Sequence, residues 1–111
     1  MASHFLAILP LTSIADQLYT IASSRSHKLV ATACKASTAE HAVVLLYDTQ
    51  TWRPFGQPLQ GHELTVTRIA FSPDDRYILT VSRDRTFCLF ELADGRSFRS
   101  LVSCVNSYGF K

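Results

Sequence analysis

The sequence predicts an all-β chain made of about two similar units, each with four short antiparallel strands. Runs of β-branched and aromatic residues alternate with compact turn signals, such as Ser-Pro-Asp-Asp at 72–75 and Asp-Gly at 94–95. Apolar residues show no convincing helical spacing, and Pro10 counts against a helix in the ambiguous stretch 8–22. A repeat of strand-like segments along the chain is the third observation that favours this fold class.

The second unit, residues 61–103, shows the pattern more clearly. A polar stretch at 83–86 is short enough to be a hairpin connection between two of its strands. Successive strands joined by short turns predict an antiparallel meander. The strands expected in this unit are 66–71, 77–82, 87–92 and 97–105.

The first unit, residues 18–60, follows the same order less regularly. The stretch 52–60 is interpreted as a turn and an outer edge strand, where Pro54 and Pro58 are tolerated. The other strands expected in this unit are 19–23, 29–34 and 43–48.

The spacing of the repeat indicates the architecture. From Tyr47-Asp48 to the similar pair Phe90-Glu91 is about 43 residues, within the ~40–45-residue period of a propeller blade. The two units are therefore expected to be two four-stranded blades. Outside them lie a divergent N-terminal segment, 1–17, and a C-terminal tail, 104–111.

The second blade carries a set of motifs at fixed spacing. Gly61-His62 precedes its first strand, Ser-Pro-Asp follows that strand, and Ser82-x-Asp84 closes the second strand. These features resemble the WD repeat, which implies a partial WD-repeat β-propeller. In that family a buried hydrogen-bond network links such a histidine, serine and aspartate, so the resemblance implies this structural role for His62, Ser82 and Asp84. The network normally ends on a tryptophan indole, and Phe90 has no indole N–H; the first blade also lacks the Gly-His pair.

His62, Ser82 and Asp84 are also the residue types of a nucleophilic triad. A triad serine needs an exposed, strained position and an oxyanion hole, and the chain has no Gly-x-Ser-x-Gly elbow. We therefore expect no catalytic residue and no enzyme activity. His27 and His41 show no ligand spacing with Cys34, so no metal or other cofactor is expected.

Composition and cysteine usage restrict the location and partners only loosely. Cys34, Cys88 and Cys104 are far apart without C-x-x-C spacing, which favours reduced thiols in the cytoplasm, with the nucleus as an additional location. The apolar run 5–11 is shorter than the roughly 20 residues that span a bilayer. The net charge of +2 neither requires nor excludes an acidic partner.

Two pairs of residues are candidate contact positions. Arg83 and Arg85 flank Asp84 in a short loop, and loops on rigid scaffolds often carry function. The alternative is a solvated turn paired with the aspartate. Trp52 beside Arg53 is a candidate anchor, since both residue types are frequent among interface hot spots. The alternative for Trp52 is packing against a neighbouring blade.

Three further stretches are not typical of WD repeats in general. They are Ala-Cys-Lys-Ala at 33–36, Glu-His-Ala at 40–42 and Ser-Arg-Asp-Arg at 82–85. Their order and spacing resemble blades of the second subunit of the Elongator complex. The resemblance implies a non-catalytic scaffold role that supports tRNA wobble-uridine modification. The other Elongator subunits would be the partners, tRNA would be reached only indirectly, and no membrane or small-molecule substrate is implied.

Two other binding functions stay open. A generic WD-repeat adaptor for another multiprotein assembly would share the fold and differ in its partners. An RNA-contacting module would use exposed arginines such as Arg83 and Arg85, and its binding would weaken as salt rises. A propeller ring needs at least four blades, about 160 residues, so we expect either a piece of a longer protein or completion on a partner.

Overall fold

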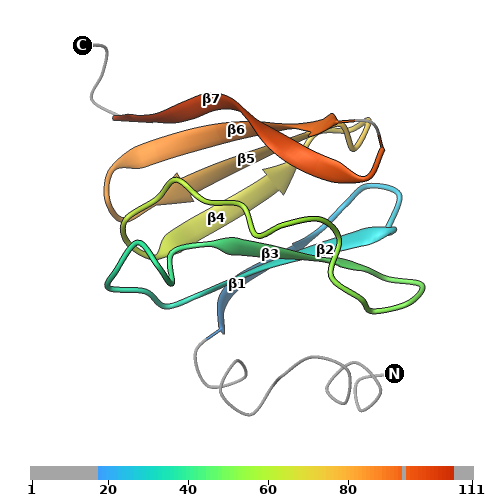
Figure 1. Ribbon diagram of the computed structural model, residues 1–111, viewed down its shortest axis with the longest axis horizontal. Coiled ribbons are helices and arrows are strands. Elements are labelled where there is room, and N and C mark those ends of the chain that lie inside the picture. The colour runs from blue at the N-terminus through green and yellow to red at the C-terminus, as the bar shows by residue number, and fades with distance from the viewer. Residues whose placement is uncertain (1–17, 94, 107–111) are drawn as a thin grey trace.

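The computed structural model describes residues 18–93 and 95–106 (Figure 1). The predicted N-terminal segment, 1–17, and the last residues of the predicted tail, 107–111, lie outside the described residues. Within the described part, no helix is long and apolar enough to cross a membrane.

The described residues form seven strands in two antiparallel sheets. The first sheet has the order β1-β2-β3, and the second has the order β4-β5-β6-β7. Each is a meander of neighbouring strands, so the predicted all-β fold with antiparallel units is confirmed. The strands of the first sheet are β1 (Leu18–Ser23), β2 (Leu29–Cys34) and β3 (Val44–Asp48). Those of the second are β4 (Val66–Phe71), β5 (Tyr77–Ser82), β6 (Thr86–Ala93) and β7 (Ser97–Asn106).

The expected fourth strand of the first unit is not a regular strand. Only two isolated bridges join this stretch to β3, between Val44 and Leu59 and between Tyr47 and Pro54. Between these bridges β3 advances by three residues and the edge stretch by five, and Gly56 in that stretch has a φ of 71°, so the two segments do not stay in one register. The first sheet therefore has three strands rather than four.

One hydrophobic core joins the two sheets. β1 lies beside β4 in space, and buried side chains from both sheets form a single cluster. The first sheet contributes Ala31, Val44 and Leu46, and the second contributes Ile78 and Phe90 among others. Strand alternation explains this burial, because every second residue of a strand faces the same side of its sheet.

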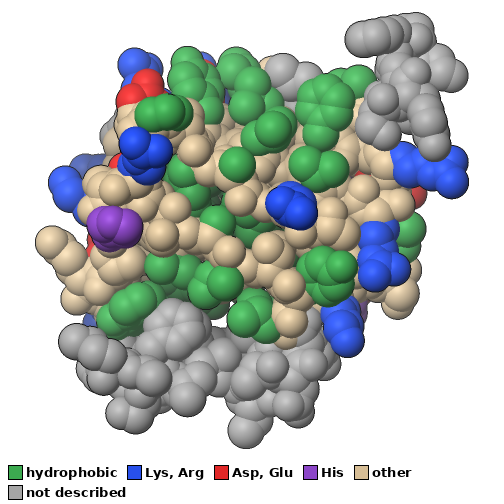
Figure 2. Space-filling view, turned by 180° about the vertical axis from the view of Figure 1, so that it is seen from behind, with side chains coloured by type: hydrophobic (Ala, Val, Ile, Leu, Met, Phe, Trp, Pro, Cys, Tyr) green, Lys and Arg blue, Asp and Glu red, His purple; other side chains and the backbone are tan. Residues whose placement is uncertain are grey.

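Large hydrophobic side chains also remain on the surface. Ile21 is 52% exposed, Leu101 is 46% exposed and Leu79 is 40% exposed. Figure 2 shows hydrophobic side chains spread over one face of the molecule, with Lys and Arg among them.

The expectation of reduced cysteines does not hold for Cys88, which is disulfide-bonded. Cys34 is a free thiol.

Candidate functional site

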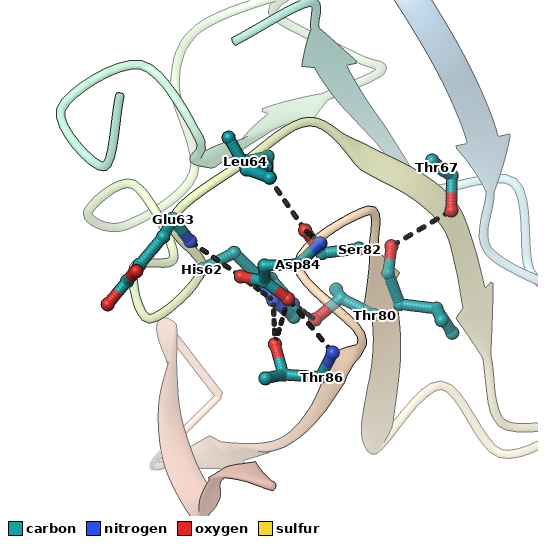
Figure 3. Close-up of polar contacts among 9 residues, drawn as sticks. His62, Glu63, Leu64, Thr67, Thr80, Ser82, Asp84 and Thr86 are labelled. Carbon is teal, nitrogen blue, oxygen red and sulfur yellow. Dashed lines mark hydrogen bonds and ion pairs between the residues drawn. The ribbon is translucent and has the colours of Figure 1, made fainter. Parts of the chain in front are cut away.

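His62 lies in the segment that leads into β4 and is almost completely buried, with 4% of its surface exposed. Its Nε2 atom lies 2.7 Å from Oγ1 of Thr80 in β5 (Figure 3). Its Nδ1 atom lies 2.9 Å from Oγ1 of Thr86 at the start of β6. Gly61 before it has a φ of 141°, a conformation that favours glycine. The imidazole therefore bridges two strands of the second sheet.

The Asp84 carboxylate organises the β5–β6 turn. Its Oδ2 atom accepts a hydrogen bond from the backbone N–H of Glu63 at 2.7 Å. Its Oδ1 atom accepts from the backbone N–H of Thr86 at 2.9 Å and also from the Thr86 hydroxyl. One carboxylate thus ties the segment before β4 to the turn between β5 and β6.

The order of donors and acceptors assigns the protons on His62. Because the Thr86 hydroxyl donates its single proton to Asp84, its oxygen accepts from Nδ1 of His62. Nδ1 therefore carries the proton, and Nε2 of the neutral ring accepts from the Thr80 hydroxyl. The result is one directed series of hydrogen bonds that ends on the Asp84 carboxylate.

The pKa shifts agree with this order. Burial lowers the pKa of His62 below its ordinary value of 6.5, and the Asp84 carboxylate, 3.6 Å from Nδ1, opposes this shift only in part. For Asp84, burial raises the pKa, but hydrogen bonds from Glu63 and Thr86 outweigh it and leave the pKa below 3.8. At neutral pH the pair is a neutral imidazole beside an ionised carboxylate.

Ser82 contributes to the turn rather than to a reactive centre. Its hydroxyl donates to the carbonyl oxygen of Leu64 at 2.8 Å and accepts from the backbone N–H of Asp84 at 3.1 Å. A nucleophilic serine instead gives its proton to a general base, and it must be open to substrate. Ser82 is only 6% exposed, so the arrangement is structural.

The sequence analysis assigned His62, Ser82 and Asp84 to the hydrogen-bond network. It gave no part in the network to Thr80 or to Thr86, which ends the Ser82-x-Asp84-x-Thr86 motif, although the hydroxyls of both lie against the imidazole. Strand alternation could have revealed Thr80, because it lies on the same buried face of β5 as Ser82.

Phe90 occupies the position at which the sequence analysis noted the absence of a tryptophan indole. It is buried, with 3% of its surface exposed. Among the residues that the structure describes, no buried side-chain nitrogen or oxygen lacks a hydrogen-bond partner. The absence of an indole donor therefore leaves no orphaned polar atom in the described part of the network.

The two predicted contact pairs lie at opposite ends of the sheets. Arg83 and Arg85 are exposed in the β5–β6 turn, and the Arg83 guanidinium lies 5.7 Å from the centre of the Tyr19 ring. Trp52 is half-buried and Arg53 is exposed, in the turn that follows β3. The structure therefore does not join the four residues into one surface.

Within the described ranges, no group of three or more His, Cys, Asp or Glu residues could hold a metal ion.

Comparison with known proteins identifies the motif. The family model "WD domain, G-beta repeat" matches residues 53–91, which include His62, Ser82 and Asp84. Residues 53–91 of this chain match a WD repeat. The match extends beyond the hydrogen-bond network to the edge segment that precedes it and to most of β6.

Solved structures similar to this chain are propellers. It superposes with a TM-score of 0.64 and 12% identity on the β-propeller domain of Myceliophteria thermophila Cps50 (Swd1), covering 88% of this chain and 32% of that one. With Kluyveromyces lactis Hsv2 the TM-score is 0.58 at 16% identity, covering 78% of this chain and 28% of that one. At such low identity the likeness concerns the fold alone. The predicted partial propeller is confirmed.

Curated relatives of this chain are more similar to it in sequence. It is 54% identical over 78 residues to Elongator complex protein 2 of Schizosaccharomyces pombe, covering 70% of this chain and 10% of that protein. It is 46% identical over 95 residues to Elongator complex protein 2 of Mus musculus, covering 81% and 11%. The chain thus spans about a tenth of the length of the curated relatives it matches. The predicted resemblance to this subunit is confirmed, and WD-repeat propellers are typically non-catalytic scaffolds.

Proposed function

We propose that this chain acts within a non-catalytic WD-repeat scaffold of the Elongator complex and so supports tRNA wobble-uridine modification. The observation that carries the proposal is the 54% identity with Elongator complex protein 2 of Schizosaccharomyces pombe over 70% of this chain. The partners would be other Elongator subunits, and tRNA would be reached only through them. We also propose a cytoplasmic location for the chain, with the nucleus as a second location.

The geometry of the turn supports a binding role over a catalytic one. The polar groups of His62, Ser82 and Asp84 are engaged in hydrogen bonds that hold backbone segments together. They hold in place a turn that presents the exposed side chains of Arg83 and Arg85. A rigid turn with exposed arginines suits contact with another macromolecule.

Exposed apolar side chains support the same role. Ile21 on β1 and Leu79 on β5 are both at least 40% exposed although they lie within strands. Apolar side chains exposed on a strand can be covered by a partner or by a neighbouring unit. We expect such surfaces to be buried in the assembled complex.

The proposal is tested by tagging the gene at its native locus, so that the protein is recovered in the form the cell makes. Quantitative mass spectrometry of the purified material should show other Elongator subunits enriched over a tag-only strain. If no such subunit is enriched, the Elongator proposal is wrong; a different, reproducible set of proteins would favour a generic WD-repeat adaptor.

Paired variants of the tagged protein locate the contact. Arg83→Ala with Arg85→Ala tests one end of the sheets, and Trp52→Ala with Arg53→Ala tests the other. Arg76→Ala, which removes an exposed arginine from the β4–β5 turn, is the matched control. Loss of the same subunits in one pair, with the control unchanged, assigns the contact to that end.

A further inference from the structure

An open hollow lies between the two sheets, at the end that carries the β5–β6 turn. Its volume is about 570 Å³. The β2–β3 loop, the segment before β4 and the β5–β6 turn meet at this end of the molecule (Figure 1). The residues that face the hollow and carry chemistry are Tyr19, Lys35, Ser37, Leu64 and Arg83.

Backbone hydrogen bonds hold the walls of the hollow in place. The N–H of Ala36 donates to Oγ1 of Thr65 at 2.8 Å, and that hydroxyl donates to the Ala36 carbonyl at 3.1 Å. The N–H of Arg83 donates to the Thr65 carbonyl at 2.9 Å. Thr65 thus joins three chain segments, and its hydroxyl is already engaged. Recognition of a ligand falls to the side chains of Lys35, Ser37 and Arg83.

Charge and shape together indicate the ligand. Lys35 and Arg83 are cations, and none of the described residues that line the hollow carries a carboxylate. Leu64 is 37% exposed and Tyr19 is 40% exposed, so both present apolar surface. The guanidinium of Arg83 lies over the Tyr19 ring at 5.7 Å from its centre, which orients this cation. An anionic group beside an aliphatic one would satisfy both features of the hollow.

We infer that this hollow is a docking site for an acidic peptide segment of a partner protein. A glutamate or aspartate side chain would pair with Lys35 and Arg83, and a neighbouring aliphatic side chain would pack on Leu64. The inference goes beyond the scaffold role, because it names the chemistry of the partner and does not require that partner to be an Elongator subunit.

The same observations favour a peptide over RNA. One face of the Tyr19 ring is occupied by Arg83, and base stacking on exposed aromatic rings supplies much of the affinity for single strands. An RNA groove is also expected to follow the phosphate backbone with a row of cations. Here the lining provides Lys35 and Arg83, and the net charge of the chain is only +2.

The test is fluorescence anisotropy with the purified protein and three labelled probes. These are a short peptide of alternating glutamate and leucine, its glutamine–leucine counterpart, and oligouridylate of similar length. We expect the acidic peptide to bind and the glutamine counterpart to bind about tenfold more weakly, since each lost charged contact is worth roughly that factor. Lys35→Ala and Arg83→Ala should each weaken acidic-peptide binding by about five- to tenfold.

Controls separate docking from misfolding and from general electrostatics. Arg76→Ala, at the other end of the sheets, removes the same charge and should leave peptide binding unchanged. Urea unfolding curves of the variants should match that of the parent, because Lys35 and Arg83 are exposed.

The inference is overturned if the acidic peptide does not bind at up to about 1 mM, where a weak site should already be half-occupied. It is also overturned if both peptides bind alike or if Arg76→Ala weakens binding as much as Arg83→Ala. Preferential binding of oligouridylate that the same variants abolish would assign the hollow to RNA instead. No Elongator subunit is present in this assay, so its failure leaves the co-purification result untouched.

Discussion

In the first hairpin of each sheet, a serine closes the turn in the same way. The N–H of Ser24 donates to the Leu29 carbonyl at 2.9 Å, and its Oγ accepts from the Leu29 N–H at 3.1 Å. The N–H of Ser72 donates to the Tyr77 carbonyl at 2.9 Å, and its Oγ accepts from the Tyr77 N–H at 3.0 Å. The first hairpin turns of the two sheets therefore contain equivalent hydrogen bonds.

The likeness extends to the strained position of each turn. His27 and Asp75 both have a φ of 63°, and the N–H of each donates to the serine carbonyl at 2.9 Å. Histidine and aspartate are among the residues that enter this left-handed region more readily than most. Local chemistry alone can form this turn, so it persists in both sheets.

The opposite end of the two sheets differs. In the second sheet, Asp84 closes a short turn, and a buried histidine connects the neighbouring strands. In the first sheet a longer loop, 35–43, joins β2 to β3, and Thr65 of the second unit holds its first residues through Ala36. The first sheet thus depends on its neighbour for polar contacts that the second supplies internally.

The second unit also contacts the first at the end that carries the two serine turns. The carboxylate of Asp75 accepts hydrogen bonds from the N–H groups of Arg25 at 2.8 Å and Ser26 at 3.1 Å. Two side chains from the second unit, Thr65 before β4 and Asp75 in the β4–β5 turn, therefore bond to loops at both ends of the first sheet. These contacts between the units are expected to stabilise the first sheet.

Removing the His62 hydrogen-bond network should have the largest effect on the free energy of unfolding. His62→Ala leaves a cavity and takes away the partner of two hydroxyl groups, so we expect the free energy of unfolding to fall by about 2–4 kcal/mol. Urea denaturation followed by circular dichroism measures this change. His41→Ala, in an exposed loop, is the control and should stay within about 0.5 kcal/mol of the parent. Equal losses in the two variants would contradict a special role for the network.

Matched glycine variants of the shared turn isolate the contact between sheets. Asp75→Gly and His27→Gly relieve the same backbone strain and add the same freedom to the unfolded chain. Asp75→Gly also removes the bonds to Arg25 and Ser26, so it should be less stable than His27→Gly by about 1 kcal/mol. The comparison uses urea denaturation of both proteins. If their unfolding free energies change by the same amount, the carboxylate does not stabilise the first sheet.

Lowering the pH should destabilise the second sheet, with a smaller effect than the substitutions above. The pKa of His62 is lowered in the fold, so below about pH 6.5 the unfolded chain binds a proton more readily than the native one. Stability should be fully present above that pH and decrease as the pH falls, with a shallow slope because Asp84 partly opposes the shift. The contribution of Asp84, whose pKa is also lowered, should be lost further down, below about pH 3.8.

Unfolding free energies measured from pH 8 to pH 5, about the range in which histidine titrates, test this sign. His62→Gln should flatten the curve in that range. An identical slope in the variant, or greater stability of the parent at low pH, would show that another group controls the dependence.

Much of the fold was predictable because its determinants are local. Strand alternation and the serine-led turn placed the strands of the second unit, and Gly61-His62 pointed to the buried imidazole. Two predictions failed. The register between β3 and the stretch 52–60 changes around Gly56, so the expected edge strand is not regular, and Cys88 is disulfide-bonded although no other cysteine lies near it in the sequence.

The sequence by itself determined the all-β class, the repeat and the family resemblance, because alternation, turn chemistry and motif spacing are properties of short segments. Only the tertiary structure decided that Thr80 and Thr86 complete the histidine network, that Thr65 and Asp75 hold the neighbouring sheet, and that Tyr19, Lys35 and Arg83 face one hollow. These residues come from segments far apart in the chain. Their proximity is set by how the two sheets pack, and packing depends on the whole core rather than on any one stretch of residues.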